Sequence, residues 1–361
     1  VGGGCFVAIN YVGAKETGRL QNVIVVLLIA ILTVFTLLGT LRAEPSNLPP
    51  ATDVVTTLET TGLIFVSYLG FVQITSVAEE IKDPGTNLPR AVIGSVVIVT
   101  VIYALVLVIM SAAVPKGFIA GVVSSNAENP IAVVEVGQYI QGAVMGGALL
   151  FGGLLATASS ANASILASSR INFAMGRDYI VTPALNEIHG RFGTPYRATG
   201  ITGGLILLFI VVGDLTLLSG AASGLHLIIY GLLNLALIVM RYVDPEEYTP
   251  EFIVPLYPLL PILGVVFSFA LLIFVAGDAL ALSFGIAIAA VLWYFLYART
   301  RTEKQGILSK HIVSRSRDMP AAAVNAATSV QPDGGQFRVM VPLANPAHEQ
   351  ELVTLASAIA K

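Results

Sequence analysis

The residues best suited to chemistry lie in one stretch, FVSYLGFVQITSVAEEIKDPGTNLPRA (residues 65–91). It begins as an apolar helix that carries Ser67, Tyr68 and Gly70, and it ends in the acidic pair Glu79 and Glu80. Hydroxyl groups beside a glycine suit hydrogen bonding to a small polar ligand, but they lack the nucleophile–base pair or metal ligands that catalysis needs. What these residues can bind depends on how deep in a membrane their helix places them.

The two glutamates define this depth. A charged residue at the centre of a membrane helix costs about 2.5–3.5 kcal/mol on insertion scales, so Glu79 and Glu80 are expected at the cytoplasmic interface. Gly70 precedes Glu79 by nine residues, which corresponds to about 14 Å at about 1.5 Å per helical residue. Because the hydrocarbon core is about 30 Å thick, Gly70 is predicted at its midplane.

Gly70 allows two interpretations. It can permit the chain between Phe65 and Phe71 to unwind, which leaves backbone N–H and C=O groups without intrahelical partners. Secondary transporters use such half-helix ends to hold the charged groups of a zwitterion. Alternatively, Gly70 only allows close packing against another helix. The residues alone leave both interpretations open.

The composition indicates an integral membrane protein. Of the 361 residues, 55% are hydrophobic and 11% are charged, whereas soluble domains carry about 25% charged residues. Eight charge-free runs are candidate spans, and they occupy residues 20–41, 60–78, 91–115, 136–169, 198–213, 215–240, 252–277 and 279–298. Such runs are too long for barrel strands, so we predict an all-α polytopic protein in a lipid bilayer. A single cysteine, Cys5, excludes an intrachain disulfide.

The positions of Lys and Arg predict the orientation. If residues 13–19 are cytoplasmic, only Arg42 and Lys116 of the 19 basic residues fall on the opposite side. By the positive-inside rule, the tail after Arg299 is then cytoplasmic. We expect a multi-pass protein of the cell (plasma) membrane.

Several segments resemble, in order, the amino acid–polyamine–organocation (APC) permeases. GFVQITSVAEEIKDPGTNLPRAV (residues 70–92) is similar to the sixth-span signature of that family, and the other similar segments are INYVGAKETGRLQ (9–21), ASILASSRINFAMGRDYIVTPALNEIHGRFGTP (163–195) and SGLHLIIYGLLNLALIVMRY (223–242). The resemblance covers residues 1–300 and implies a leucine-transporter-type fold of two inverted five-helix repeats with two added helices. Counted that way, the chain holds the end of span four and spans five to twelve. We therefore expect an N-terminally truncated permease that lacks spans one to three.

The resemblance also implies a substrate pocket between spans one, three, six, eight and ten. In this pocket the substrate's amino group would be held by backbone carbonyls near Phe65, Val66, Ser67 and Tyr68. Its side chain would pack near Phe71 and span eight. The substrate class implied is an amino acid or a related amine.

Two serines of span eight extend this predicted site. Ser160 precedes Arg170 by ten residues, about 15 Å along a helix, which places it at the same depth as Gly70. Ser164 shares its helix face. By resemblance both serines fall near substrate-facing positions, and the alternative is a packing face of small residues.

No complete span offers an evident buried acid or base for a proton relay. Some relatives carry a lysine in span five where this chain has Leu28, so the coupling proton or cation is left open. Glu79 and Glu80 are interpreted as an anchor for the end of span six, paired with Lys82 or Arg90. A cytoplasmic gating role is the alternative.

After residue 300 the composition changes. Residues 301–335 combine a basic juxtamembrane segment, suited to anionic lipid headgroups, with a linker expected to be flexible. Residues 336–361 predict a strand followed by a helix. This pair resembles the start of a universal stress protein (UspA-like) domain, so we expect the first β-α unit of a truncated α/β domain.

These features predict a secondary active transporter of amino acids or related amines that works by alternating access. We expect no cofactor, no bound metal and no nucleic-acid partner. Two alternatives stay open, namely a membrane nutrient sensor that signals through the stress-protein domain and an ion channel. An enzyme is disfavoured because the spans carry no nucleophile–base pair or metal-ligand cluster.

Overall fold

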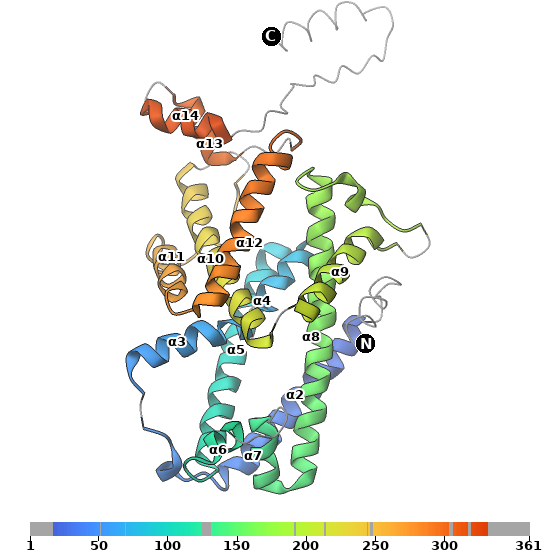
Figure 1. Cartoon of the computed structure of the whole chain (residues 1–361), viewed down its shortest axis with the longest axis vertical. Coiled ribbons are helices and arrows are strands. Elements are labelled where there is room, and N and C mark those ends of the chain that lie inside the picture. Colours follow the sequence, from blue (N-terminus) through green and yellow to red (C-terminus); the bar gives the residue numbers. More distant parts are fainter. Residues whose placement is uncertain are drawn as a thin grey trace, which may run out of the picture.

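The computed structural model of the chain describes residues 17–50, 52–68, 70–124, 131–190, 193–212, 214–243, 245, 248–302, 306–316 and 319–330. This part of the chain is mostly helical and contains no strand (Figure 1). The α-helices are α2 (Thr17–Thr40), α3 (Val54–Ile64), α4 (Gly70–Gln73), α5 (Pro84–Ala112), α6 (Phe118–Ser124), α7 (Ala132–Gln141), α8 (Ala143–Arg177), α9 (Tyr196–Val212), α10 (Leu215–Val243), α11 (Leu259–Leu272), α12 (Gly277–Trp293), α13 (Ile307–Ser314) and α14 (Ala321–Val330). Shorter turns are the 3₁₀ segments η1 (Pro45–Asn47), η2 (Phe65–Tyr68), η3 (Ile74–Glu80) and η4 (Pro183–Asn186), and the π-helical η5 (Tyr294–Ala298).

By length and composition, five helices of the described chain are able to cross a membrane. They comprise Gln21–Thr40, Pro84–Ala112, Ala143–Arg177, Leu215–Val243 and Gly277–Ala298. They correspond to five of the eight predicted runs and support a polytopic helical membrane protein.

The other three predicted runs are not long continuous helices. Run 198–213 forms α9, which has 17 residues, and run 252–277 contains α11, which has only 14 residues. Proline lacks the N–H that a helix needs and restricts the residue before it, so Pro255 and Pro258 delay the start of α11. Run 60–78 is divided among α3, η2, α4 and η3. A count of charge-free runs therefore overestimates the number of long helices.

The long run 136–169 is also divided, at Gly142. This glycine has a φ of 71°, a left-handed backbone conformation that suits glycine. The short helix α7 ends there and α8, with 35 residues, begins at the next residue. The early part of the run thus belongs to a separate helix, which packs against α8.

Two hydrophobic clusters hold the helices together. The first surrounds Phe35, which is fully buried, and joins α2, α7, α8 and the end of α5. The second surrounds Leu227 and joins α10, α11 and α12. Close approach of α10 to α12 depends on Gly224, which faces Ser283. The Ser283 hydroxyl lies 3.0 Å from the carbonyl oxygen of Ala221 and can donate to it. Residues 65–80 contact both α8 and α10, and Phe65 packs against the second cluster.

The tail departs from the predicted flexible linker. Residues 321–330 form α14, an alanine-rich helix in agreement with the high helix propensity of alanine. The Ser309 hydroxyl of α13 donates to the Ala327 carbonyl of α14 over 2.8 Å, and the two helices lie together beyond the end of α12 (Figure 1). The predicted β-α unit at residues 336–361 lies outside the described residues.

Candidate functional site

The helix that carries the predicted site changes type at the expected place. The α-helix α3 begins after Asp53, whose carboxylate accepts hydrogen bonds from the Thr56 backbone N–H (3.1 Å) and hydroxyl (2.6 Å), and it ends at Ile64. Residues 65–68 continue as 3₁₀ turns, and an α-helix resumes at Gly70. We call residues 65–80 the broken segment.

Residues 65–68 form tightened turns rather than the unwound chain that we predicted there. Phe65 keeps a right-handed helical backbone with φ −56° and ψ −29°. A 3₁₀ turn joins each N–H to the carbonyl three residues back instead of four. Where an α-helix passes into 3₁₀ turns, this shift skips one carbonyl oxygen of the ladder. The Phe65 N–H still donates to the Thr61 carbonyl, so the carbonyl that is skipped lies in the last turn of α3, just before residues 65–68.

A pocket of 660 Å³ opens beside the broken segment, and we call it the central pocket. Its walls are the broken segment, α2 and α5. Four predicted site residues line it: Ser67, Tyr68, Gly70 and Phe71. Among the described residues, no atom lies within 4 Å of the position that a Cβ on Gly70 would occupy, so Gly70 borders open space in this part of the chain. Both interpretations of Gly70 stay predictions. The volume is within the range of about 300–1,000 Å³ found for small-ligand sites.

Tyr68 joins the broken segment to α5. Its hydroxyl lies 3.2 Å from the Thr100 hydroxyl, within hydrogen-bond distance. Its ring meets the Tyr103 ring edge-on, with the ring centres 5.8 Å apart. Because Tyr103 also lines the central pocket, these contacts connect the pocket wall on α5 to the 3₁₀ turns.

Tyr230 of α10, which the sequence did not single out, packs against both ends of the break. Its ring stacks on Phe71 and meets Phe65 edge-on, with ring centres 5.7 Å apart in both pairs. His226, one turn earlier, contacts the same ring at 5.9 Å. The Tyr230 hydroxyl is buried and has no hydrogen-bond partner among the described residues. A buried hydroxyl without a partner carries a cost of about 1–3 kcal/mol, so this group calls for a functional explanation.

The two predicted serines of α8 differ in their surroundings. Ser164 accepts a hydrogen bond from the Gln73 side-chain amide over 3.0 Å, which ties α8 to the broken segment. Ser160 is exposed and is not among the residues that line the central pocket. Ser164 thus contacts the broken segment through Gln73, which was not a predicted site residue, and neither serine lines the central pocket. Gln73 was missed, although an amide in an apolar span is a signal for interhelical hydrogen bonding.

The side chains of Val66, Glu79 and Glu80 lie outside what the structure describes. The backbone of Val66 belongs to η2, and the two glutamates are the last residues of η3. Their predicted pairing and gating roles stay predictions. Within the described residues, no cluster of three or more His, Cys, Asp or Glu side chains could hold a metal ion.

Comparison with known proteins assigns the family. A family model described as amino acid permease matches residues 4–296. The chain belongs to the amino acid permease family. The chain is 27% identical over 297 residues to the branched-chain amino acid permease BcaP of Bacillus subtilis (strain 168), covering 81% of this chain and 62% of the relative. It is 30% identical over 306 residues to the methylthioribose transporter of the same organism, covering 82% and 62%.

A third relative is the branched-chain amino acid permease BcaP of Lactococcus lactis subsp. cremoris (strain MG1363), 28% identical over 314 residues, covering 81% of this chain and 63% of the relative. These relatives are transporters, not enzymes. The predicted membership of the APC permeases is thus confirmed. The chain spans 62% of the length of the first two relatives.

Proposed function

We propose that this permease is a secondary transporter of amino acids or related amines that works by alternating access around the broken segment. The observation that carries the proposal is the interruption of the α-helix at Phe65–Tyr68 beside a pocket of 660 Å³. Irregular backbone at membrane depth is tolerated only where it is buried in protein or lines a cavity. Secondary transporters place substrate sites at such interruptions.

The proposed binding mode follows from the chemistry of the break. The substrate's ammonium group is held by carbonyl oxygens of Phe65, Val66, Ser67 and Tyr68, as a half-helix end holds a cation. The substrate's side chain packs against Phe71, which lines the central pocket. Ser164 contributes through Gln73, and Ser160 is a more distant candidate.

Tyr230 supplies the element that distinguishes the two states of the cycle. In the present structure its hydroxyl is buried without a described partner, while its ring holds Phe65 and Phe71. In the second state the broken segment moves and gives this hydroxyl a partner. A group that is satisfied in one state only shifts the balance between the two states.

The proposal extends to features of the whole protein. It includes the inverted-repeat, leucine-transporter-type fold, a coupling proton or cation, and Glu79 and Glu80 at the cytoplasmic end of the broken segment. It also includes a permease domain over residues 1–300, a juxtamembrane segment over 301–335 and the start of a cytoplasmic UspA-like domain over 336–361. The family match over residues 4–296 supports the first of these domains.

Counterflow tests the proposal. The full-length protein is placed in liposomes loaded with unlabelled leucine, and entry of labelled leucine and labelled methylthioribose is followed, since relatives are named for these substrate classes. We expect labelled leucine, or another amino acid of a wider panel, to accumulate transiently above its equilibrium level, whereas accumulation of methylthioribose, which has no ammonium group, would contradict the proposed binding mode. Binding without flux would instead favour a sensor, and single-channel currents would favour a channel.

A further inference from the structure

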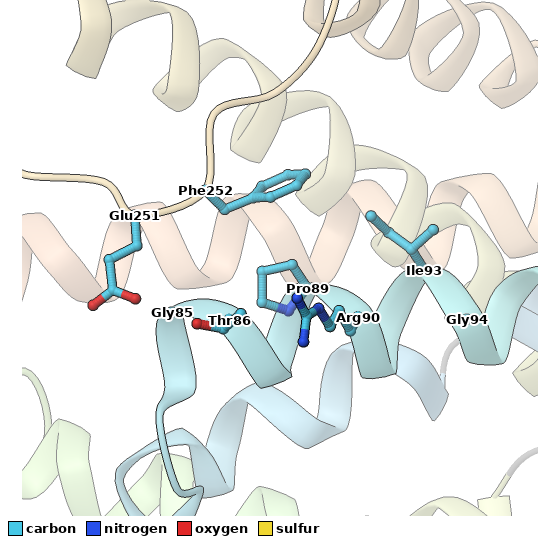
Figure 2. A pocket seen from close by; sticks show the side chains of 8 residues that line it. All are labelled: Gly85, Thr86, Pro89, Arg90, Ile93, Gly94, Glu251 and Phe252. Carbon is cyan, nitrogen blue, oxygen red and sulfur yellow. The ribbon is translucent and has the colours of Figure 1, made fainter.

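A second pocket lies where the beginning of α5 meets the segment between α10 and α11. We call it the α5 N-terminal pocket, and its volume is 380 Å³. The α5 side contributes Gly85, Thr86 and Arg90 among others, and the opposite side contributes Glu251 and Phe252. Figure 2 shows Glu251 and Phe252 extending from one segment towards α5, with Phe252 above Pro89 and Glu251 beside Gly85. No residue is shared between this pocket and the central pocket.

The two pockets lie on different faces of one helix. Thr86, Pro89, Arg90 and Ile93 recur at helical spacing and line the α5 N-terminal pocket. Residues 92, 95, 96, 99 and 103 of the same helix line the central pocket. Residues three and four apart share a helix face, so α5 separates the two spaces. A ligand that fixes the beginning of α5 therefore acts on a wall of the central pocket.

The α5 N-terminal pocket presents two charges of opposite sign that are not paired with each other. Arg90 and Glu251 both line it, and neither side chain has an ion pair or a hydrogen bond with the part of the chain that the structure describes. Their side chains are exposed, in keeping with a site open to water. The guanidinium of Arg90 is suited to a carboxylate, which it can bind through two parallel hydrogen bonds. The carboxylate of Glu251 is suited to an ammonium group.

The start of α5 leaves room for the Glu251 carboxylate. Gly85 has no side chain, and a Cβ there would overlap the Glu251 carboxylate. The N-terminal end of a helix also favours a negative charge. Gly85 and the helix dipole thus favour the position of the Glu251 carboxylate, which is the acceptor for an ammonium group. The rings of Phe252 and Pro89 supply an apolar wall.

We propose that the α5 N-terminal pocket is a second binding site for a small zwitterionic amino acid with an apolar side chain. The ligand's ammonium group binds Glu251, its carboxylate binds Arg90, and its side chain lies against Phe252. Because both charges are exposed, binding is weak, with a dissociation constant of about 1 mM. The cytoplasmic location of this pocket rests on the proposed function, and so does a role in slowing uptake when internal substrate is high. Binding of the amino acid to the pocket does not rest on it.

The test places a reporter beside the pocket. A nitroxide label is attached at Thr249→Cys, an exposed position two residues before Glu251, in a Cys5→Ser background of the full-length protein in lipid nanodiscs. The paramagnetic broadening of the methyl signals of L-leucine is then measured as a function of leucine concentration. We expect broadening that saturates at millimolar leucine and weakens by about tenfold or more with Glu251→Gln or Arg90→Gln.

Two ligands with one charge each provide the control on the unaltered pocket. We expect 3-methylbutylamine, which lacks the carboxylate, and 4-methylpentanoate, which lacks the ammonium group, to bind at least about tenfold more weakly than leucine. The proposal is overturned if the leucine signals show no saturable broadening, or if the signals of the one-charge analogues broaden equally. Both measurements use the unaltered pocket, so they do not depend on the folding of a variant. Gly70→Leu, which places a side chain in the central pocket, should keep a saturable signal. Loss of the signal in that variant would assign it to the central pocket and would likewise overturn the second site.

Discussion

Replacement of Tyr230 with phenylalanine should raise the free energy of unfolding but lower the rate of counterflow. The variant keeps the ring contacts with Phe65 and Phe71 and removes only the buried hydroxyl without a described partner. Removal of an unsatisfied buried hydroxyl should stabilise the present state by about 1–3 kcal/mol. If the second state bonds this hydroxyl, the same change moves the balance between states by about 5- to 150-fold. We therefore expect a higher free energy of unfolding, measured by denaturant titration in nanodiscs, together with slower counterflow.

Tyr68→Phe is the matched control. Its hydroxyl lies 3.2 Å from the Thr100 hydroxyl, so its removal should lower the free energy of unfolding by about 0.5–1.5 kcal/mol. The two variants remove the same atom type from the two sides of the break and should differ in the sign of their effect on stability. If Tyr230→Phe lowers stability as Tyr68→Phe does, or leaves counterflow unchanged, then the hydroxyl does not distinguish two states and the reasoning is refuted.

Two further predictions concern the hydrogen bond between Gln73 and Ser164 and the carboxylate of Asp53. Unfolding is measured for Gln73→Leu, for Ser164→Ala and for the double variant. The coupling free energy from this cycle should be about 0.6–1.7 kcal/mol, as for interhelical hydrogen bonds in membranes. A coupling near zero would show that the 3.0 Å contact contributes nothing to stability. Hydrogen bonds from Thr56 lower the pKa of Asp53 from its usual value of 3.8. A lowered folded-state pKa means that the carboxylate stabilises the start of α3 above pH 3.8 and loses this effect as pH falls through the folded value. Hydrogen exchange at the Thr56 and Thr57 amides should thus become faster in acid, relative to Asp53→Asn, which caps the helix without titrating; equal acid dependence in both proteins would contradict this.

The location of the break could be predicted because it follows from local chemistry and from charge. Glu79 and Glu80 set the predicted depth, and Gly70 beside two hydroxyl-bearing residues indicated a break within residues 65–71. In the structure the α-helix ends at Ile64 and resumes at Gly70. The kind of break could not be predicted, because the choice between extended chain and 3₁₀ turns depends on packing. Tyr230 lies far from Phe65 and Phe71 in the sequence, yet its ring packs against both of theirs. No local pattern in the sequence reports such a contact.

The number of long helices was overestimated for a related reason. A charge-free run reports where backbone can enter lipid, but it does not report where the helix starts within the run. Pro255 and Pro258 allow apolar residues before α11 to stay outside a helix. In the tail, the alanine-rich composition of residues 321–330 already favoured a helix, and its contact with Ser309 supplied the packing that a linker lacks.

Counterflow by Gly70→Leu tests the central claim most directly. A leucine there should project into the central pocket without displacing a neighbour, since no described atom lies within 4 Å of the Cβ position. Gly204→Leu in α9 is the matched control, because its Cβ would also meet none of the described atoms within 4 Å. We predict that Gly70→Leu inserts in the membrane at normal levels and abolishes counterflow, while Gly204→Leu keeps it. Normal counterflow by a well-inserted Gly70→Leu protein would contradict the assignment of the broken segment as the transport site.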